Sequence, residues 1–247
     1  MLFRSFTYRF AVFAVMISLL LGTSSSPASA QDAVAMVDEA ARTMLELDSF
    51  HFSVTTELGK TLLSEQIELT GIEGDVLRPD AFRAEFTVEL GFASLDLSAI
   101  GIGSSLWVSD PISGNNQYIE LSGEGLETLP PRELLNPDRL VMLAVSLLKD
   151  SAIKGDDEIN DRPVINIEGT LDPRDLEQLG TPVPEELLSD IEPLTVDLWI
   201  DEDHRIVRTE FAGALLPSER DAGPLVRRIE LSAFNEPLTI EAPGVQA

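Results

Sequence analysis

The sequence predicts an α+β fold built on a large antiparallel sheet. The clearest evidence is the segment from Phe82 to Leu90, in which apolar residues alternate with charged or polar ones. Such alternation is typical of a strand with one buried and one solvated face. The strand-like segments also follow one another as hairpins instead of alternating with helices, which favours α+β over a parallel sheet. We count about ten strands and three or four helices.

Residues 1–30 have the pattern of a secretory signal peptide. Two arginines are the only charged residues before position 32, and the apolar run over 10–21 is too short to cross a membrane. The segment ends in Ala28-Ser29-Ala30, a small-x-small motif that signal peptidase accepts. We therefore expect cleavage between Ala30 and Gln31, a secreted or extracytoplasmic location, and a single domain over 31–247. An uncleaved anchor is the alternative.

The spacing of apolar residues identifies the elements of the first half in order. Steps of three and four residues between Val34 and Leu45 predict a helix over 32–47. Beyond this helix the step changes to two, which is the period of a strand. Glycines and the stretch 110–116 supply the turns. The predicted strands cover 50–58, 63–69, 82–90, 95–99, 106–108 and 118–121.

The second half is predicted to place helices between hairpins. Asn136-Pro137 reads as an N-cap followed by proline at the first helical position, an apolar stripe covers 140–148, and Gly155 lies past the end. Asp172-Pro173 begins a second short helix. The remaining predicted elements are a helical turn at 185–189, hairpins that pair 153–159 with 164–169 and 195–200 with 204–211, and a last strand over 225–234.

The composition excludes several classes of function. With 43 acidic and 17 basic residues, the chain has a formal net charge of −26, which repels phosphate backbones. We therefore expect no nucleic-acid partner. The chain has no cysteine, so it forms no disulfide, no zinc–thiolate site and no lipid-modified cysteine. We expect no cofactor, no metal and a monomer.

Catalytic motifs are incomplete. Ser146-Leu147-Leu148-Lys149 matches S-x-x-K but lacks the partner motifs and lies in an apolar helical stripe, so we interpret Ser146 as a helix residue. No residue is nominated as catalytic or as a metal ligand. By the same reasoning Gly101 to Gly103 is interpreted as a turn, His51 and His204 as bonded or solvated side chains, and the acidic clusters 156–158 and 201–203 as solvated turns without calcium-loop spacing.

Four stretches resemble the LppX/LprG-type (LppX_LprAFG) lipoprotein family, in the order in which that family has them. Residues 72–86 (IEGDVLRPDAFRAEF) resemble its G-D-V-x-R-P segment entering a strand, and 135–140 (LNPDRL) resemble its helix start. Residues 161–170 (DRPVINIEGT) and 196–208 (VDLWIDEDHRIVR) are similar to two of its hairpins. The family's lipobox cysteine is replaced by Ala28-Ser29-Ala30, so we expect a protein that is not lipid-anchored.

The resemblance implies a strongly curved antiparallel β half-barrel with helices covering its concave face and an apolar cavity between, similar to the LolA/LolB-like lipid-carrier fold. Family members hold acylated lipid or glycolipid and move it in the cell envelope, which is the function that we expect. The sequence pattern leaves open whether the helices fill the concave face instead. The predicted cavity wall consists of Phe52, Val54, Ile67, Leu69, Phe82, Phe86, Val88, Leu97, Leu106 and Val108 from strands, and Leu140, Leu143, Ala144 and Leu147 from the middle helix.

Two other functions stay open at this point. The same fold would serve a sensor or assembly module that binds an envelope membrane protein, and such a module would form a stable protein complex with little lipid. An esterase that acts on bound lipid ranks third, because the sequence nominates no nucleophile for it.

Overall fold

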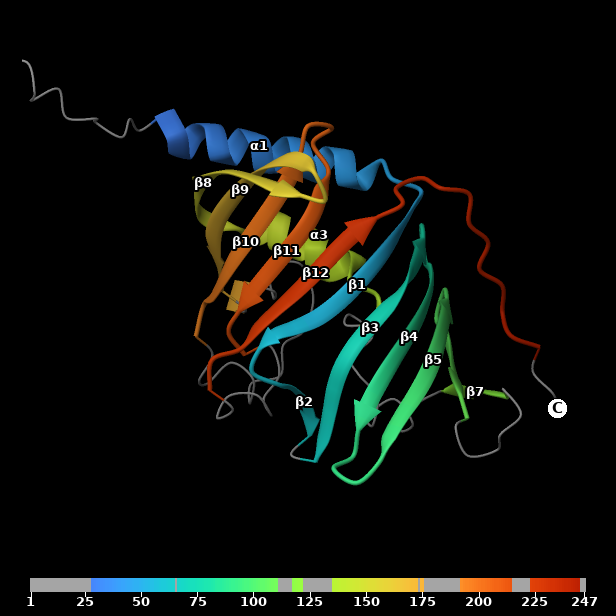
Figure 1. Ribbon diagram of the computed structural model, residues 1–247. Helices are drawn as coiled ribbons and strands as arrows, with labels where there is room; N and C mark the ends of the chain where they lie inside the picture. The colour runs from blue at the N-terminus through green and yellow to red at the C-terminus, as the bar shows by residue number, and fades with distance from the viewer. Residues whose placement is uncertain are drawn as a thin grey trace, which may run out of the picture.

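The computed structural model describes residues 28–64, 66–110, 117–121, 135–172, 174–175, 192–214 and 223–244. Twelve strands form one sheet, and every paired strand in it is antiparallel. The α+β class is confirmed (Figure 1). The elements are α1 (Ala28–Leu45), β1 (Ser49–Leu58), β2 (Thr61–Ser64), β3 (Ile67–Leu77), β4 (Ala81–Glu89), β5 (Ser94–Ile102), β6 (Ser105–Ser109), β7 (Tyr118–Leu121), α3 (Asp138–Leu147), β8 (Lys149–Ile159), β9 (Arg162–Leu171), β10 (Leu194–Asp201), β11 (Ile206–Ala212) and β12 (Val226–Ser232).

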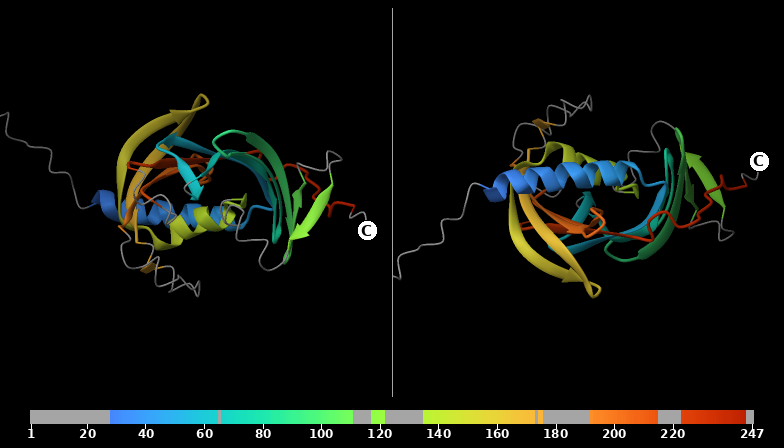
Figure 2. Two further views of the ribbon diagram at one scale, coloured as in Figure 1. Left: turned by 90° about the horizontal axis from the view of Figure 1, so that it is seen from below. Right: turned by 90° about the horizontal axis from the view of Figure 1, so that it is seen from above.

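The last strand joins two hairpin series into one sheet. The strand order is β7-β6-β5-β4-β3-β1-β12-β11-β10-β9-β8, with β2 paired to β3 off this path. Strand β12 therefore lies between β1 and β11, so the first and last strands of the domain are neighbours. Figure 2 shows the sheet bending around α3, with α1 crossing on the same side. Helix α1 packs on β8 and on α3.

Helix α1 buries a stripe that differs from the predicted one. The stripe consists of small and medium apolar residues at steps of four and three, namely Ala33, Val37, Ala40, Met44 and Leu47 just past the helix end. Val34 and Leu45, which the spacing placed on the buried face, are 51% and 64% exposed. Apolar residues cover more than one face of this helix, so periodicity alone allows two different buried stripes. The observed buried stripe contains the small residues Ala33 and Ala40, which allow the helix to pack close to its neighbours.

The middle helix is shorter than expected. Pro137 occupies the N-cap position of α3, and the Asn136 side chain accepts a hydrogen bond of 3.2 Å from the amide of Asp138. The helix ends at Leu147, and β8 begins two residues later. Gly155, predicted to follow the helix, lies inside β8 instead, beside a register shift and with a φ of 149°. The glycine therefore marks a β-bulge and not a helix terminus.

Several other predictions are corrected, confirmed or left open. The segment predicted as one strand over 63–69 is divided between β2 and β3, because the chain turns back at Gln66. The acidic cluster 156–158 is part of β8, so it is not a turn. Both predicted hairpins, β8 with β9 and β10 with β11, are confirmed. At the predicted helix start, the Asp172 carboxylate accepts a hydrogen bond of 3.0 Å from the amide of Arg174. The predicted turn at 185–189 and residues 1–27 of the predicted signal segment 1–30 lie outside the described residues.

Candidate functional site: the apolar inner face of the sheet

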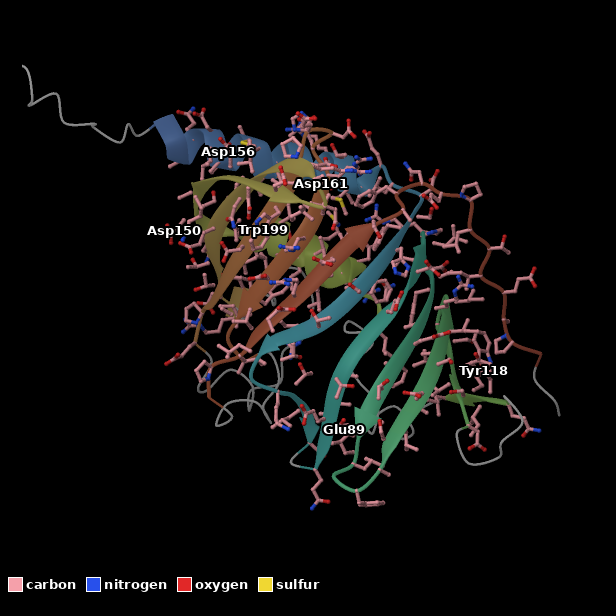
Figure 3. All side chains as sticks on the ribbon, in the orientation of Figure 1. Glu89, Tyr118, Asp150, Asp156, Asp161 and Trp199 are labelled. Carbon is pink, nitrogen blue, oxygen red and sulfur yellow. The ribbon has the colours of Figure 1, made fainter. Side chains whose placement is uncertain are left out.

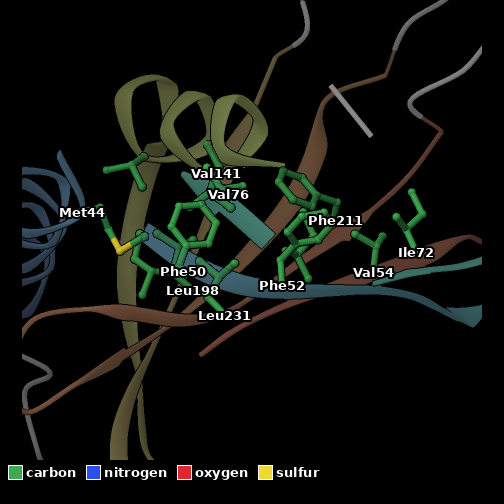
Figure 4. Close-up of a cluster of buried hydrophobic side chains, with 14 of the residues drawn as sticks. Met44, Phe50, Phe52, Val54, Ile72, Val76, Val141, Leu198, Phe211 and Leu231 are labelled. Atoms are coloured by element: carbon green, nitrogen blue, oxygen red, sulfur yellow. The ribbon is translucent and has the colours of Figure 1, made fainter. Parts of the chain in front are cut away.

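One face of the sheet, here called the inner face, packs against the two helices. Alternation places Phe50, Phe52 and Val54 of β1 on it, and all three are at most 5% exposed. The register then sets Phe52 opposite Leu231 of β12 and Val54 opposite Ile229. Figure 4 shows these side chains filling the space between the strands and α3, from Met44 at one end to Ile72 at the other. The inner face is thus continuous across both halves of the sheet.

Glycines on neighbouring strands make room for the largest rings of this face. Phe82 is paired with Gly101, where an added Cβ would lie 2.1 Å from the Phe82 ring. Phe52 is paired with Gly74, where an added Cβ would lie 2.9 Å from the ring and 2.2 Å from the Arg83 carbonyl oxygen. Each ring therefore lies over a position that tolerates no side chain. Gly101, predicted to lie in a turn, is part of β5, and the turn itself is at Gly103, with a φ of 58°.

The structure brings all fourteen predicted wall residues into one apolar cluster. Four of them, Ile67, Leu97, Leu140 and Leu143, are half-buried and pack against it. The other ten are buried inside the cluster: Phe52, Val54, Leu69, Phe82, Phe86, Val88, Leu106, Val108, Ala144 and Leu147. In this structure those ten have little surface left for a ligand, whereas the half-buried four keep some.

The inner face differs between its two ends. At the end under α1, here the α1 end, Met44, Phe50 and Leu231 are at most 4% exposed. The opposite end, where β2 and the starts of β3 and β5 lie (Figure 1), is here called the β2 end. Its inner residues are only partly buried. These half-buried residues are Leu63, Ile67, Leu95 and Leu97. The β2 end therefore presents the apolar surface that a ligand could contact.

Sequence reasoning missed the contribution of the second half of the sheet. Leu198, Phe211 and Ile229 belong to the same cluster and are at most 1% exposed. Their strands were predicted, but their position beside the first half depends on β12 pairing with β1. That pairing joins residues about 180 positions apart in the sequence, a separation that local periodicity does not reveal. The available signal was the step of two from Leu225 to Leu231.

Arg78 ties both helices to the sheet at the α1 end. Its guanidinium donates to the Asp138 carboxylate at the start of α3, with Nε to Oδ2 at 3.0 Å and Nη2 to Oδ1 at 2.5 Å. Its Nη1 also donates to the carbonyl oxygens of Met44 and Leu47 at the end of α1. A cation at the last turn of one helix and an anion at the first turn of the next both suit the helix dipoles. This arginine belongs to the R-P pair of the stretch 72–86.

The outer face of the sheet is largely polar, apart from a small buried cluster of Ile159, Val164 and Trp199. His51 Nδ1 lies 3.0 Å from Asp75 Oδ1, and Arg83 Nη2 donates to Asp75 Oδ2 at 2.6 Å. Burial raises the pKa of the Asp75 carboxyl, but the hydrogen bonds from His51 and Arg83 outweigh it and hold the pKa below its usual value. Surface acids such as Glu89, Asp156 and Asp161 surround this face (Figure 3).

Two grooves on the outer face are lined by polar and apolar groups together. One, of about 570 Å³, crosses β1, β3, β4 and β5 and presents hydroxyls and the carboxylates of Glu73, Glu85 and Asp96. The other, of about 320 Å³, lies beside the β8–β9 turn and includes His51 and Glu230. Neither presents the broad apolar surface that an acyl chain requires.

The residues considered for catalysis have structural roles. The Ser146 hydroxyl donates to the Leu143 carbonyl at 3.2 Å within α3, as expected for a helix residue. His204 is exposed in a turn, and Asp201 organises that turn by accepting from the amides of Asp203 and Arg205. In the ranges that the structure describes, no group of three or more His, Cys, Asp or Glu side chains is placed to hold a metal ion. No helix in those ranges is long and apolar enough to span a membrane.

The fold and the inner face define an α+β protein in which a twelve-stranded antiparallel sheet carries two helices on an apolar face. The chain belongs to the LppX_LprAFG lipoprotein family, which it matches over residues 32–240. It is 24% identical to the lipoarabinomannan carrier protein LprG of Mycobacterium tuberculosis over 227 residues, which cover 91% of this chain and 87% of LprG.

Two solved structures share the fold. LprF from Mycobacterium bovis aligns with a TM-score of 0.60 and 18% identity, covering 86% of this chain and 97% of LprF. LppX from Mycobacterium tuberculosis aligns with a TM-score of 0.53 and 17% identity, covering 85% of this chain and 99% of LppX. The resemblance found in the sequence is thus confirmed for the family and for an LppX-like α+β fold. The apolar cavity between the sheet and the helices stays a prediction.

Proposed function

We propose that this protein binds an acylated lipid or glycolipid against the apolar inner face and carries it through the aqueous part of the cell envelope. One observation carries the proposal: the inner face is continuous, and at the β2 end its apolar side chains are only half-buried. The similarity to LprG, named a lipoarabinomannan carrier, supports the same ligand class. We assign the protein no enzymatic step.

The energetics favour this use of the surface. Each methylene that leaves water contributes about 0.8 kcal/mol, so a ligand with two or three acyl chains gains enough to offset its ordering. The half-buried Leu97 and Leu143 are proposed to contact the chains first. The acidic outer surface keeps a loaded carrier soluble, because its net charge is far from zero.

We further propose that the protein is released from the membrane after cleavage between Ala30 and Gln31. The sequence has no cysteine to receive a lipid anchor. Intact-mass measurement of the secreted protein should give a mature N-terminus at Gln31. A retained signal segment would overturn the proposed release without affecting the lipid site.

The test uses lipid extraction and mass spectrometry of protein purified without detergent. The wild-type protein should release lipid in stoichiometric amount. Leu97→Trp should weaken binding about tenfold, because a ring that displaces two methylenes removes about 1.6 kcal/mol. Glu85→Trp, on the outer face of the neighbouring strand, is the matched control and should bind as the wild type does.

Three outcomes would count against the proposal. Lipid-free protein that takes up neither acylglycerol nor glycolipid would overturn it. Equal losses of lipid binding in both tryptophan variants would show that binding does not depend on the inner face. A stable complex with an envelope membrane protein, in the absence of lipid, would favour the sensor or assembly function instead.

A further inference from the structure

The most exposed large apolar side chain in the described part of the chain lies in the turn between β4 and β5. Phe92 is 93% exposed. The turn is short, because the Leu90 amide donates to the Ala93 carbonyl at 2.8 Å and leaves only Gly91 and Phe92 between them. Gly91 has a φ of 78°, the left-handed conformation that suits the first central position of a two-residue hairpin turn. The hairpin therefore presents the Phe92 ring to solvent at its tip.

The apolar surface of the β2 end continues onto this turn. The register pairs Glu68 of β3 with Glu89 of β4. Ile67 and Leu90 are the next residues outward on these strands, and alternation returns both side chains to the inner face. Both are half-buried, as is Leu95 on the neighbouring strand β5. Figure 1 shows the β4–β5 turn next to the end of β2 at the lower edge of the molecule. A strip of apolar residues thus leads from the inner face to the tip.

The tip itself carries no charge. Residues 90–95 (LGFASL) are all uncharged, and they are flanked by the acids Glu89 and Asp96. The nearest lysine in the adjoining hairpin, Lys60, is already paired with Glu68. Anionic headgroups are attracted by clusters of basic residues, which this turn does not contain, and the net charge of −26 repels them. A membrane contact at this turn would therefore depend on apolar insertion.

The position of Phe92 distinguishes it from other exposed apolar residues. Single apolar side chains on a protein surface are normal and need no explanation. Leu45 of α1, which is 64% exposed between Met44 and Glu46, is such a residue. Phe92 is more exposed, and it lies at the end of the apolar strip that leads to the proposed lipid site.

We propose that the β4–β5 turn docks the protein on the surface of a lipid bilayer, with the Phe92 ring inserted at the boundary between headgroups and acyl chains. This inference rests on the proposed function and adds to it the place where the carrier meets the membrane. Apolar and aromatic residues bind this boundary because their surface leaves water there. With the ring inserted, Ile67 and Leu95 would lie next to the bilayer. A lipid would then pass to the inner face with little exposure of its chains to water.

The contact is expected to be weak and reversible. One phenyl ring removes less apolar surface from water than a myristoyl chain does, and a single myristoyl chain gives only marginal membrane binding. Weak docking suits a carrier, because the protein must leave the membrane after it has taken up its lipid.

The experiment measures binding of the purified full chain to vesicles by flotation. One set of vesicles contains phosphatidylcholine alone, and the other contains phosphatidylcholine mixed with anionic phosphatidylglycerol. The wild type should bind the first set, and the anionic lipid should weaken binding. Phe92→Ser should reduce binding about tenfold, as expected when a phenyl ring no longer leaves water. Leu45→Ser, which removes an exposed apolar side chain from α1, is the matched control and should bind as the wild type does.

A fluorescent variant locates the contact. Phe92→Trp should keep the binding, and its emission should shift to shorter wavelength when vesicles are added. The native Trp107 and Trp199 are 9% and 7% exposed, so the wild-type emission should change little. A Phe92→Trp emission that stays unchanged in vesicle-bound protein would overturn the insertion of this turn.

The uptake of lipid from vesicles separates this inference from the proposed function. Phe92→Ser should take up lipid more slowly than the wild type but reach the same final amount. Equal vesicle binding by the wild type and Phe92→Ser would overturn the docking role and leave the lipid site intact. Binding that increases with phosphatidylglycerol would also overturn it, because charge elsewhere on the protein would then be responsible. Vesicle binding that depends on Phe92, in a protein that takes up no lipid, would instead overturn the proposed function.

Discussion

The two ends of the inner face are built from the same kinds of residue but are packed differently. At the α1 end, Phe50, Phe52 and Leu198 are at most 1% exposed, and both helices are tied down by Arg78. At the β2 end, Leu63, Ile67 and Leu97 are half-buried, and the buried Arg227 lies among apolar residues. This contrast indicates that the α1 end contributes more to stability. It also places the proposed binding at the β2 end, since a surface that is completely packed has nothing left to offer a ligand.

The largest expected effect is the loss of a ring at the packed end. Phe52→Ala should lower the free energy of unfolding by about 3–5 kcal/mol, because the neighbouring strands cannot collapse into the space of a fully buried phenyl ring. Leu97→Ala, at the β2 end, should cost only about 1 kcal/mol, since Leu97 is partly solvated already. Urea unfolding followed by circular dichroism measures both. Equal losses of unfolding free energy at the two positions would show that the two ends of the inner face contribute equally to stability.

The next effect concerns the tie between the helices and the sheet. Arg78→Met removes the partner of Asp138 and the donor to the Met44 and Leu47 carbonyls, and it should cost about 2–3 kcal/mol. Arg78→Lys keeps the charge but loses the two-pronged contact, so its loss should be smaller. Thermal unfolding ranks the variants. Wild-type stability in Arg78→Met would show that the helices are held by apolar packing alone.

Local sequence patterns predicted most of the sheet. The alternation in β4 and the turns of the β8–β9 and β10–β11 hairpins arise from interactions between near neighbours, which periodicity records directly. The helix N-terminus at Asn136-Pro137 was predicted to within one residue for the same reason.

The unpredicted features depend on distant parts of the chain. Whether Val34 or Ala33 faces the sheet is decided by what α1 packs against, and the sequence near the helix does not contain that information. The same applies to the candidate site. All fourteen predicted residues join the cluster, but which of them stay half-buried depends on how far the helices extend over the sheet. Arg227 lies at an inner position of a predicted strand, so the step of two assigns it to the inner face. Its charge would instead suggest an outward-facing position, because arginines are rarely buried.

The outer face sharpens the comparison, because changes there should act through charge and not through packing. Asp75, behind the first half of the sheet, has a pKa held below its usual value by His51 and Arg83 despite its burial. A lowered pKa in the folded state means that the ionised carboxylate stabilises the fold above the pKa of the unfolded chain, near 3.9, and that this contribution is lost as the pH falls through the folded pKa. Asp75→Asn should therefore cost about 1 kcal/mol at neutral pH. Urea titrations at several pH values should show the difference from wild type shrinking in acid.

Asp197, behind the second half, should behave in the opposite way. Burial and the nearby Glu168 raise the pKa of its carboxyl, while Lys154 lowers it. Its contribution to stability is complete below the unfolded pKa and is lost as the pH rises through the folded pKa. Asp197→Asn should thus stabilise the protein at neutral pH, by less than about 1 kcal/mol because the site is partly solvated. The gain should vanish well below about pH 3.9, where the wild-type carboxyl is protonated in both states.

Opposite signs for Asp75→Asn and Asp197→Asn, both smaller than the loss in Phe52→Ala, would place most of the stability on the inner face. A loss in Asp197→Asn as large as that in Phe52→Ala would instead mean that the polar face holds the second half of the sheet together.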